Sequence, residues 1–152
     1  SFDPITNGHL DIIDRAIHLF DKIIVTVAQN AEKDSHLFPY KKRMSFITKA
    51  VSELENIEVD SFEGLMVDHA VKHGAVAAIR GLRALSDFEF EFKMALMNRS
   101  LNENITTLFL VAHQKYTHLS SSIIREVAKF NGDVSRLVPK IVKNALDKKF
   151  NE

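Results

Sequence analysis

A histidine near the start of a predicted helix is the residue in this chain best suited to phosphate chemistry. It closes the run SFDPITNGH at residues 1–9, in which a proline and a glycine interrupt regular structure and Thr6 or Asn7 can cap a helix. Apolar residues at helical spacing predict that this helix covers residues 8–20. The amides of a first helical turn attract anions, and His9 adds a side-chain donor there. A lone Gly-His pair is more often a solvated or capping feature, but the whole run indicates a phosphate-binding loop.

A second candidate is the run Ile-Arg-Gly-Leu-Arg at residues 79–83, which comes directly off a predicted buried strand. The guanidinium groups of Arg80 and Arg83 can clamp a polyphosphate, because their planar forks match phosphate oxygens. Gly81 between them lets the backbone approach a ligand closely. Most Arg-x-x-Arg pairs are simply surface pairs, so it is the position at a strand end that favours a site.

The third candidate is a helix start rich in hydroxyl groups. Leu119 is followed by Ser120, Ser121 and Ser122, and an amphipathic helix to about residue 130 follows them. Free amides together with serine hydroxyls make a plausible cradle for phosphate oxygens. A plain serine N-cap, which by itself is more common, is the simpler explanation.

Several other polar residues are expected to have no part in chemistry. The run 41–43, Lys-Lys-Arg, is expected to form the solvated face of an amphipathic helix. The carboxylates at 87, 89 and 91 are expected to lie at the surface over an aromatic core face formed by Phe88, Phe90 and Phe92. The sequence contains neither a Walker loop nor a Gly-x-Gly-x-x-Gly fingerprint. No zinc site is expected, because four histidines compared for metal-ligand spacing share none: His36, His73, His113 and His118.

The elements that must position these candidates alternate along the chain. Strands are predicted at 22–28, 57–60, 75–79 and 107–111, and further helices at 39–54, 65–73, 87–98, 120–130 and from 138 to the end. This alternation predicts one α/β domain over residues 1–152, with a Rossmann-like parallel sheet flanked by helices. Because a phosphate loop of this kind normally follows a buried strand, a further apolar strand is expected ahead of Ser1. Lys33, Arg80 and the segment 113–122 then follow strand ends, where ligands bind in such sheets.

Composition limits the possible functions. The chain has 152 residues, with 20 basic and 20 acidic side chains and a net charge of +0, so neither nucleic acid nor a membrane surface is an expected partner. It has no cysteine, which rules out a cysteine nucleophile and suits a reducing compartment. No apolar run approaches the ~20 residues of a membrane span.

These motifs, in this order, carry a resemblance to a known family. The Thr-Asn-Gly-His loop resembles the signature of nucleotidyltransferases with a (Thr/His)-x-Gly-His motif. The Ile-Arg-Gly-Leu-Arg run, the following Asp-Phe-Glu-Phe-Glu at 87–91 and the Leu-Ser-Ser-Ser run resemble the bacterial phosphopantetheine adenylyltransferases in particular. The similarity extends over nearly the whole chain.

The resemblance implies a cytoplasmic enzyme of coenzyme A synthesis. It would transfer the adenylyl group of ATP to 4′-phosphopantetheine, with Mg²⁺, and release dephospho-coenzyme A and pyrophosphate. The family's mechanism is direct in-line attack of the pantetheine phosphate on the α-phosphorus. The resemblance further implies a homohexamer and feedback binding of coenzyme A at the active site.

It also implies roles for individual residues. His9 would stabilise charge on the α-phosphate and so act as the catalytic residue. The residues implied to bind phosphopantetheine are Ser1, Lys33, Met66 and Arg80. Those implied to contact ATP, besides His9, are Ser1, Phe2, Gly81, Leu82, Arg83, Glu91, Tyr116, Thr117, His118, Leu119, Ser120, Ser121 and Ser122.

Three other interpretations stay open on the sequence alone. A related nucleotidyltransferase could act on nicotinate mononucleotide or on a phosphoalcohol, since Arg80 and Lys33 favour a phosphorylated acceptor without identifying its organic part. A nucleotide sensor without catalysis is disfavoured by His9, because binding alone needs no donor at the reacting phosphorus. A structural oligomer subunit is disfavoured by the clustering of motifs at strand ends.

Overall fold

The computed structural model describes residues 1–29 and 36–151, in which helices and parallel strands alternate as the sequence predicts. In chain order, the elements are α1 (Asn7–Ala16), β1 (Ile23–Ala28), α2 (Tyr40–Ala50), β2 (Ile57–Phe62), α3 (Met66–Lys72), β3 (Ala77–Leu82), α4 (Leu85–Leu101), β4 (Thr106–Val111), the 3₁₀ helix η1 (Gln114–Tyr116), α5 (Ser121–Lys129) and α6 (Lys140–Asn151). The predicted fold class, α/β with parallel strands flanked by helices, is confirmed.

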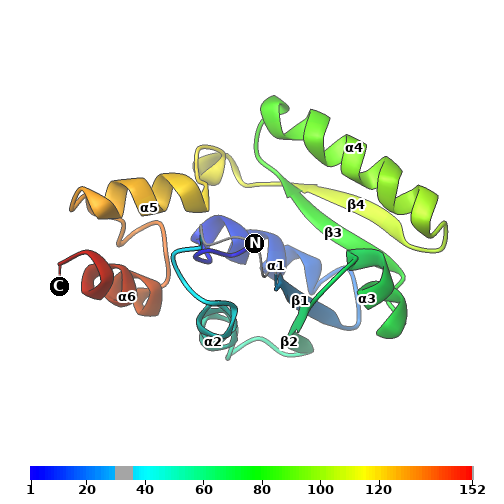
Figure 1. Ribbon diagram of the computed structural model, residues 1–152, viewed down its shortest axis with the longest axis horizontal. Helices are drawn as coiled ribbons and strands as arrows, with labels where there is room; N and C mark the ends of the chain where they lie inside the picture. The colour runs from blue at the N-terminus through cyan, green and yellow to red at the C-terminus, as the bar shows by residue number, and fades with distance from the viewer. Residues whose placement is uncertain (30–35, 152) are drawn as a thin grey trace.

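The strands pair differently from the single sheet that the sequence predicts. Within the described residues they form two parallel pairs, β1 with β2 and β3 with β4 (Figure 1). No backbone hydrogen bond joins β1 to β3 in that part of the chain.

The hydrophobic core lies around β1, where α2, α5 and α6 meet the first loop. Val27 on β1, Phe46 on α2 and Leu146 on α6 are fully buried, as is Ile5 in the loop. Phe38 and Phe46 meet edge to face with ring centroids 5.1 Å apart, a favourable geometry for two aromatic rings. This core seats the phosphate loop against the carboxyl end of β1.

Two boundaries differ from the predicted ones in ways that matter for the site. β3 runs through Leu82, so Arg80 lies within the strand rather than beyond it, opposite Phe109 of β4. The first helix ends at Ala16, not at residue 20. The backbone N–H groups of His18 and Leu19 donate to the carbonyls of Arg15 and Ala16, in the tighter i→i−3 pattern.

Helix α4 corrects the expectation of an aromatic core face. It lies along β3 and β4 at the side of the molecule away from α5 and α6 (Figure 1). None of its residues is buried, and Phe88, Phe90 and Phe92 are 44, 64 and 46% exposed. Apolar side chains surround the helix instead of forming one stripe, so packing onto β3 and β4 covers only part of them.

In the described part of the chain, no helix is long and apolar enough to cross a lipid bilayer.

Candidate active site

His9 occupies the third position of α1 and takes part in a reciprocal cap with Thr6. The hydroxyl of Thr6 accepts the backbone N–H of His9, and the backbone N–H of Thr6 donates to Nδ1 of His9 over 3.0 Å. The imidazole does here what a glutamate does in a capping box. The ring of Phe2 packs against it, with centroids 4.9 Å apart. The sequence predicted the helix start, and the structure adds that the cap itself holds the histidine.

This cap determines how the imidazole is protonated. A backbone N–H can only donate, so Nδ1 of His9 must carry a lone pair and the proton of the neutral ring sits on Nε2. Burial lowers the pKa of His9 from 6.5 to about 4; the guanidinium of Arg83 lowers it next, and Arg80 contributes less. The ring is therefore neutral at pH 7, and Nε2–H is its one available donor.

Asp3 holds the phosphate loop in place, although the sequence analysis assigned it no role. Its carboxylate is buried and accepts the backbone N–H groups of Leu37 and Phe38, at 2.8 and 2.9 Å. Arg125 of α5 donates to the backbone carbonyl of Asp3, and its guanidinium lies 3.5 Å from the carboxylate. One side chain thereby ties the loop to the segment before α2 and to α5.

Arg43 is an exception to the expectation that the run 41–43 forms a solvated helix face, since Lys41 and Lys42 are exposed and Arg43 is not. Its side chain is 2% exposed and donates to the backbone carbonyls of Ser1, at 2.7 Å, and of Ala28, at 3.5 Å. Burial lowers the pKa of the Arg43 guanidinium. The residue joins α2 to the loop and to the carboxyl end of β1. Because Arg43 stands in a run of charged residues, the sequence did not indicate that its side chain is buried.

The two arginines of the 79–83 run are each held by a carboxylate from α4. Arg80 makes a two-pronged contact with Glu91, at 2.9 and 2.7 Å, which raises the pKa of its guanidinium. Arg83 makes a similar contact with Asp87, at 3.0 and 3.1 Å, and also donates to the carbonyl of Leu119 at 2.7 Å. Such forks fix the planes of both guanidinium groups. Both also lie near enough to His9 to lower its pKa.

The two glycines of these motifs have packing reasons to be small. A Cβ on Gly81 would meet Cγ1 of Ile12 at 3.2 Å, so this glycine lets α1 approach β3. A Cβ on Gly8 would meet Cβ of Tyr116 at 3.3 Å, so the loop and η1 touch there. These contacts place the amino end of α1 between β3 and the segment that follows β4.

The serine-rich helix start joins the same site, and its members have different partners. Ser120 is the N-cap of α5, its hydroxyl accepting the N–H of Ile123 at 3.1 Å. Ser121 donates to the carbonyl of Pro4 at 2.8 Å, and the hydroxyl of Ser122 accepts a hydrogen bond from Arg125 at 3.4 Å. The plain N-cap interpretation thus describes Ser120, while Ser121 bonds the phosphate loop directly.

The structure also places the remaining predicted residues, except Lys33. Leu82 ends β3, Leu119 is buried under Arg83, Thr117 hydrogen-bonds to Gln114, and His118 is exposed. Met66 begins α3 beyond the carboxyl end of β2. The prediction for Lys33 falls outside the described residues. The roles assigned to these residues stay predictions.

A capped histidine, paired arginines and a serine-rich helix start, gathered around the carboxyl ends of parallel strands, define a nucleotidyltransferase of the α/β type. Residues 1–127 match the family model described as cytidylyltransferase-like. A structure from Vibrio parahaemolyticus, provisionally assigned as a nicotinate-nucleotide adenylyltransferase, shares the fold. Its TM-score is 0.68, its identity is 17%, and the match covers 95% of this chain and 92% of that one.

Curated relatives narrow the class to one family. Phosphopantetheine adenylyltransferase from Geotalea daltonii is 55% identical over 99% of this chain and 93% of its own length. Those from Desulfosudis oleivorans and Alkaliphilus metalliredigens are 51 and 52% identical over 98% of this chain, and the matches cover 88 and 94% of their lengths. The chain belongs to the cytidylyltransferase-like family and, within it, to the phosphopantetheine adenylyltransferases. The resemblance drawn from the motifs is confirmed.

Proposed function

We propose that this chain transfers the adenylyl group of ATP to 4′-phosphopantetheine. The observation that carries the proposal is the neutral His9, whose Nε2–H is left as a donor at a helix start near Arg83 and Arg80. A nucleotide sensor would not need a donor fixed in this way. The 51–55% identity to phosphopantetheine adenylyltransferases over nearly the whole chain supports this acceptor over nicotinate mononucleotide.

The reaction needs positioning and charge stabilisation more than covalent help from the protein. A phosphate oxygen of phosphopantetheine attacks the α-phosphorus of ATP, and the bond from that phosphorus to the bridging oxygen of the β-phosphate breaks. Dephospho-coenzyme A and pyrophosphate result. His9 would donate from Nε2 to the α-phosphate oxygen that gains charge in the transition state. Arg83 and the amide groups at the start of α5 would hold the β- and γ-phosphates.

The acceptor's phosphate would be held by Arg80, with Lys33 and Ser1. Both carboxylate oxygens of Glu91 hold Arg80, and the predicted nucleotide contact of Glu91 stays a prediction. We propose that Glu91 aims Arg80 at the phosphate, while Met66 lies along the pantetheine arm.

Mg²⁺ fits these residues poorly as a protein-bound ion. It prefers oxygen ligands, and the carboxylates of Asp87 and Glu91 are both occupied by arginine forks. We propose that Mg²⁺ arrives with ATP on its phosphate oxygens.

The function is tested by pyrophosphate release with ATP, Mg²⁺ and a panel of acceptors. The panel holds 4′-phosphopantetheine, unphosphorylated pantetheine and nicotinate mononucleotide. Release with phosphopantetheine alone is expected, because the acceptor site is built around a phosphate. Release with nicotinate mononucleotide instead would keep the His9 chemistry and replace the substrate. Silence on all three, with ATP still bound, would identify a sensor.

Replacing Arg80 with alanine is expected to raise the KM for phosphopantetheine by about 10- to 100-fold, because the acceptor's phosphate loses a charge-assisted hydrogen bond. The KM for ATP should change much less. Steady-state kinetics with each substrate varied in turn measures both effects. Arg136→Ala, an arginine exposed on the loop before α6, serves as the matched control. Equal increases for both substrates would contradict the division of roles between Arg80 and Arg83.

The exposed apolar side chains of α4 support the expected homohexamer. Phe90 is 64% exposed and Met97 56%, which is unusual for a helix lying on a sheet. We propose that α4 contributes to an interface between subunits. Phe90→Asp is expected to shift the wild-type assembly to smaller species in size-exclusion chromatography with light scattering, whereas Lys93→Asp, an exposed position on the same helix, should not. A monomeric wild-type protein would refute the proposal.

Two further expectations belong to the same proposal. Coenzyme A contains the acceptor's phosphopantetheine arm, so it should inhibit competitively with 4′-phosphopantetheine. The enzyme is expected to act in the cytoplasm, where its small-molecule substrates are found.

A further inference from the structure

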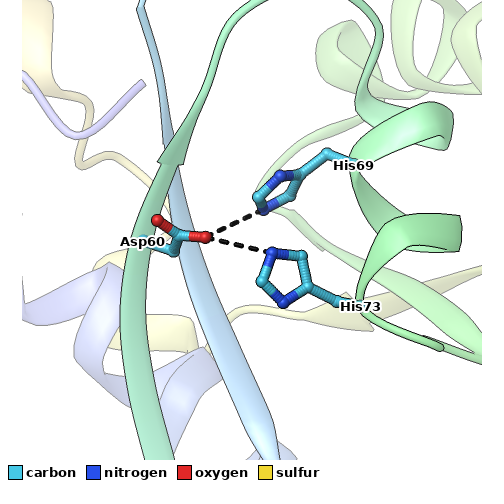
Figure 2. Close-up of side chains that lie close together, drawn as sticks. All are labelled: Asp60, His69 and His73. Carbon is cyan, nitrogen blue, oxygen red and sulfur yellow. Dashed lines mark ion pairs between the residues drawn. The ribbon is translucent and has the colours of Figure 1, made fainter.

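A group of three possible metal ligands lies between β2 and α3, outside the site described above. His69 lies on α3 and His73 is the C-cap residue four positions later, and Asp60 projects toward both from β2 (Figure 2). One nitrogen of each ring and one oxygen of the carboxylate all lie within 4.8 Å of one another. The expectation of no zinc site did not consider His69, and therefore missed its four-residue spacing to His73.

The distances suit a single small cation. Nε2 of His73 lies 3.0 Å from Oδ2 of Asp60, and Nε2 of His69 lies 3.7 Å from the same oxygen. Zinc bonds of about 2.0–2.2 Å in a tetrahedral arrangement place two ligand atoms ~3.3 Å apart. The observed separations fall on either side of this value. The two nitrogens lie within 4.8 Å of each other, so small movements of the side chains would bring all three atoms onto one ion.

Nε2 of His69 has no hydrogen-bond partner within the described residues, although it is shielded from solvent. A buried polar atom in this condition is uncommon and calls for an explanation. The ring cannot easily turn away, because it stacks on Phe62 with centroids 5.2 Å apart and lies 4.4 Å from the ring of His73. A metal ion at the centre of the three residues would satisfy this atom.

The carboxylate is also oriented in the way that metal ligands usually are. Oδ1 of Asp60 accepts the backbone N–H of Ser61 at 2.8 Å, which leaves Oδ2 directed at the histidines. Hydrogen bonds of this kind, made by the part of a ligand that does not touch the metal, fix its orientation. The side chain of Asp60 is 34% exposed, so an ion can enter from solvent.

We propose that Asp60, His69 and His73 bind one divalent transition-metal ion, with Zn²⁺ as the preferred occupant. Two imidazole nitrogens and one carboxylate oxygen suit zinc, whereas Mg²⁺ and Ca²⁺ favour oxygen ligands. The site is therefore distinct from any position of the Mg²⁺ that accompanies ATP. The ion ties α3 to β2, and water completes its coordination. This inference does not depend on the proposed function.

Isothermal titration of the metal-stripped full chain with ZnCl₂, in a buffer containing Mg²⁺, tests the proposal. One Zn²⁺ per chain with a Kd in the micromolar range or tighter is expected, together with a rise in Tm. His73→Ala and His69→Ala should each weaken binding by about 100-fold, and Asp60→Asn should weaken it as well. His18→Ala, an exposed histidine on the turn after α1, is the matched control and should bind as the wild type does.

The absorption spectrum of the wild-type protein with Co²⁺ provides a second measurement that needs no variant. Intense visible bands typical of four-coordinate cobalt, displaced by Zn²⁺, are expected. Circular dichroism shows whether each variant is folded. Absence of zinc binding in the wild type, or equal affinity in the folded His69→Ala, His73→Ala and His18→Ala proteins, overturns the proposal. If the variants fail to fold, a six-coordinate cobalt spectrum overturns it instead.

Discussion

Replacing His9 with alanine is expected to lower turnover by ~10²-fold or more while ATP still binds, the cost of losing a donor that acts in the transition state. The neutral ring presents Nε2–H because Nδ1 accepts the amide of Thr6, so removing the ring removes that donor. Single-turnover kinetics separates this loss from substrate binding, and ATP affinity is measured by titration calorimetry.

His18→Ala is the control for this experiment, because His18 is exposed just beyond α1 and is not one of the predicted site residues. The helix start needs its own check, since His9 also helps to cap it; circular dichroism of the variant should match the wild type. A His9→Ala protein with full turnover would remove His9 from the mechanism.

The protonation state of His9 has a consequence for pH dependence. Its pKa of about 4 lies below the ordinary value of 6.5, so lowering the pH from 7.5 to 5.5 leaves the ring of the unliganded protein neutral. The value of kcat/KM, which reports ionisations of free enzyme and free substrates, is therefore expected to show no His9 titration near pH 6.5. A step there that disappears in His9→Gln would show that the ring titrates normally.

Replacing Asp3 with alanine is expected to lower the free energy of unfolding by ~2–4 kcal/mol, because one buried and one partly buried amide lose their acceptor. The amides of Leu37 and Phe38 both donate to this carboxylate, and Arg125 pairs with it. Urea denaturation measures the change. Turnover should also fall, since the loop that carries His9 loses its tie to the segment before α2.

Asp14→Ala is the matched control, because Asp14 is exposed on α1; its stability should stay within ~0.5 kcal/mol of wild type. Asp3→Asn should fall between the two, since an amide keeps one acceptor oxygen. If Asp3→Ala unfolds at the same midpoint urea concentration as the wild type, solvent or other groups satisfy the two amides.

The local pattern of the sequence determined the elements and the family. Helical spacing, β-branched runs and capping residues are read within a few neighbouring positions, so the alternation of strands and helices was correct to within a few residues at most boundaries. Three motifs and their order sufficed to place the chain among phosphopantetheine adenylyltransferases. The candidate residues at 80–83 and 119–122 were found because parallel strands direct the segments that follow them to one edge.

Tertiary structure alone decided which polar residues meet across the chain. Asp3 reaches Leu37 and Arg125, and Arg43 reaches Ser1, through contacts between elements far apart in sequence. The local sequence pattern assigns a charged residue to the surface, because the pattern does not include the distant hydrogen-bond partner that offsets the free-energy cost of burying the charge. The same holds for Asp60 beside His69 and His73: the spacing on α3 is visible in the sequence, but the carboxylate that completes the group comes from a strand whose register only the fold defines.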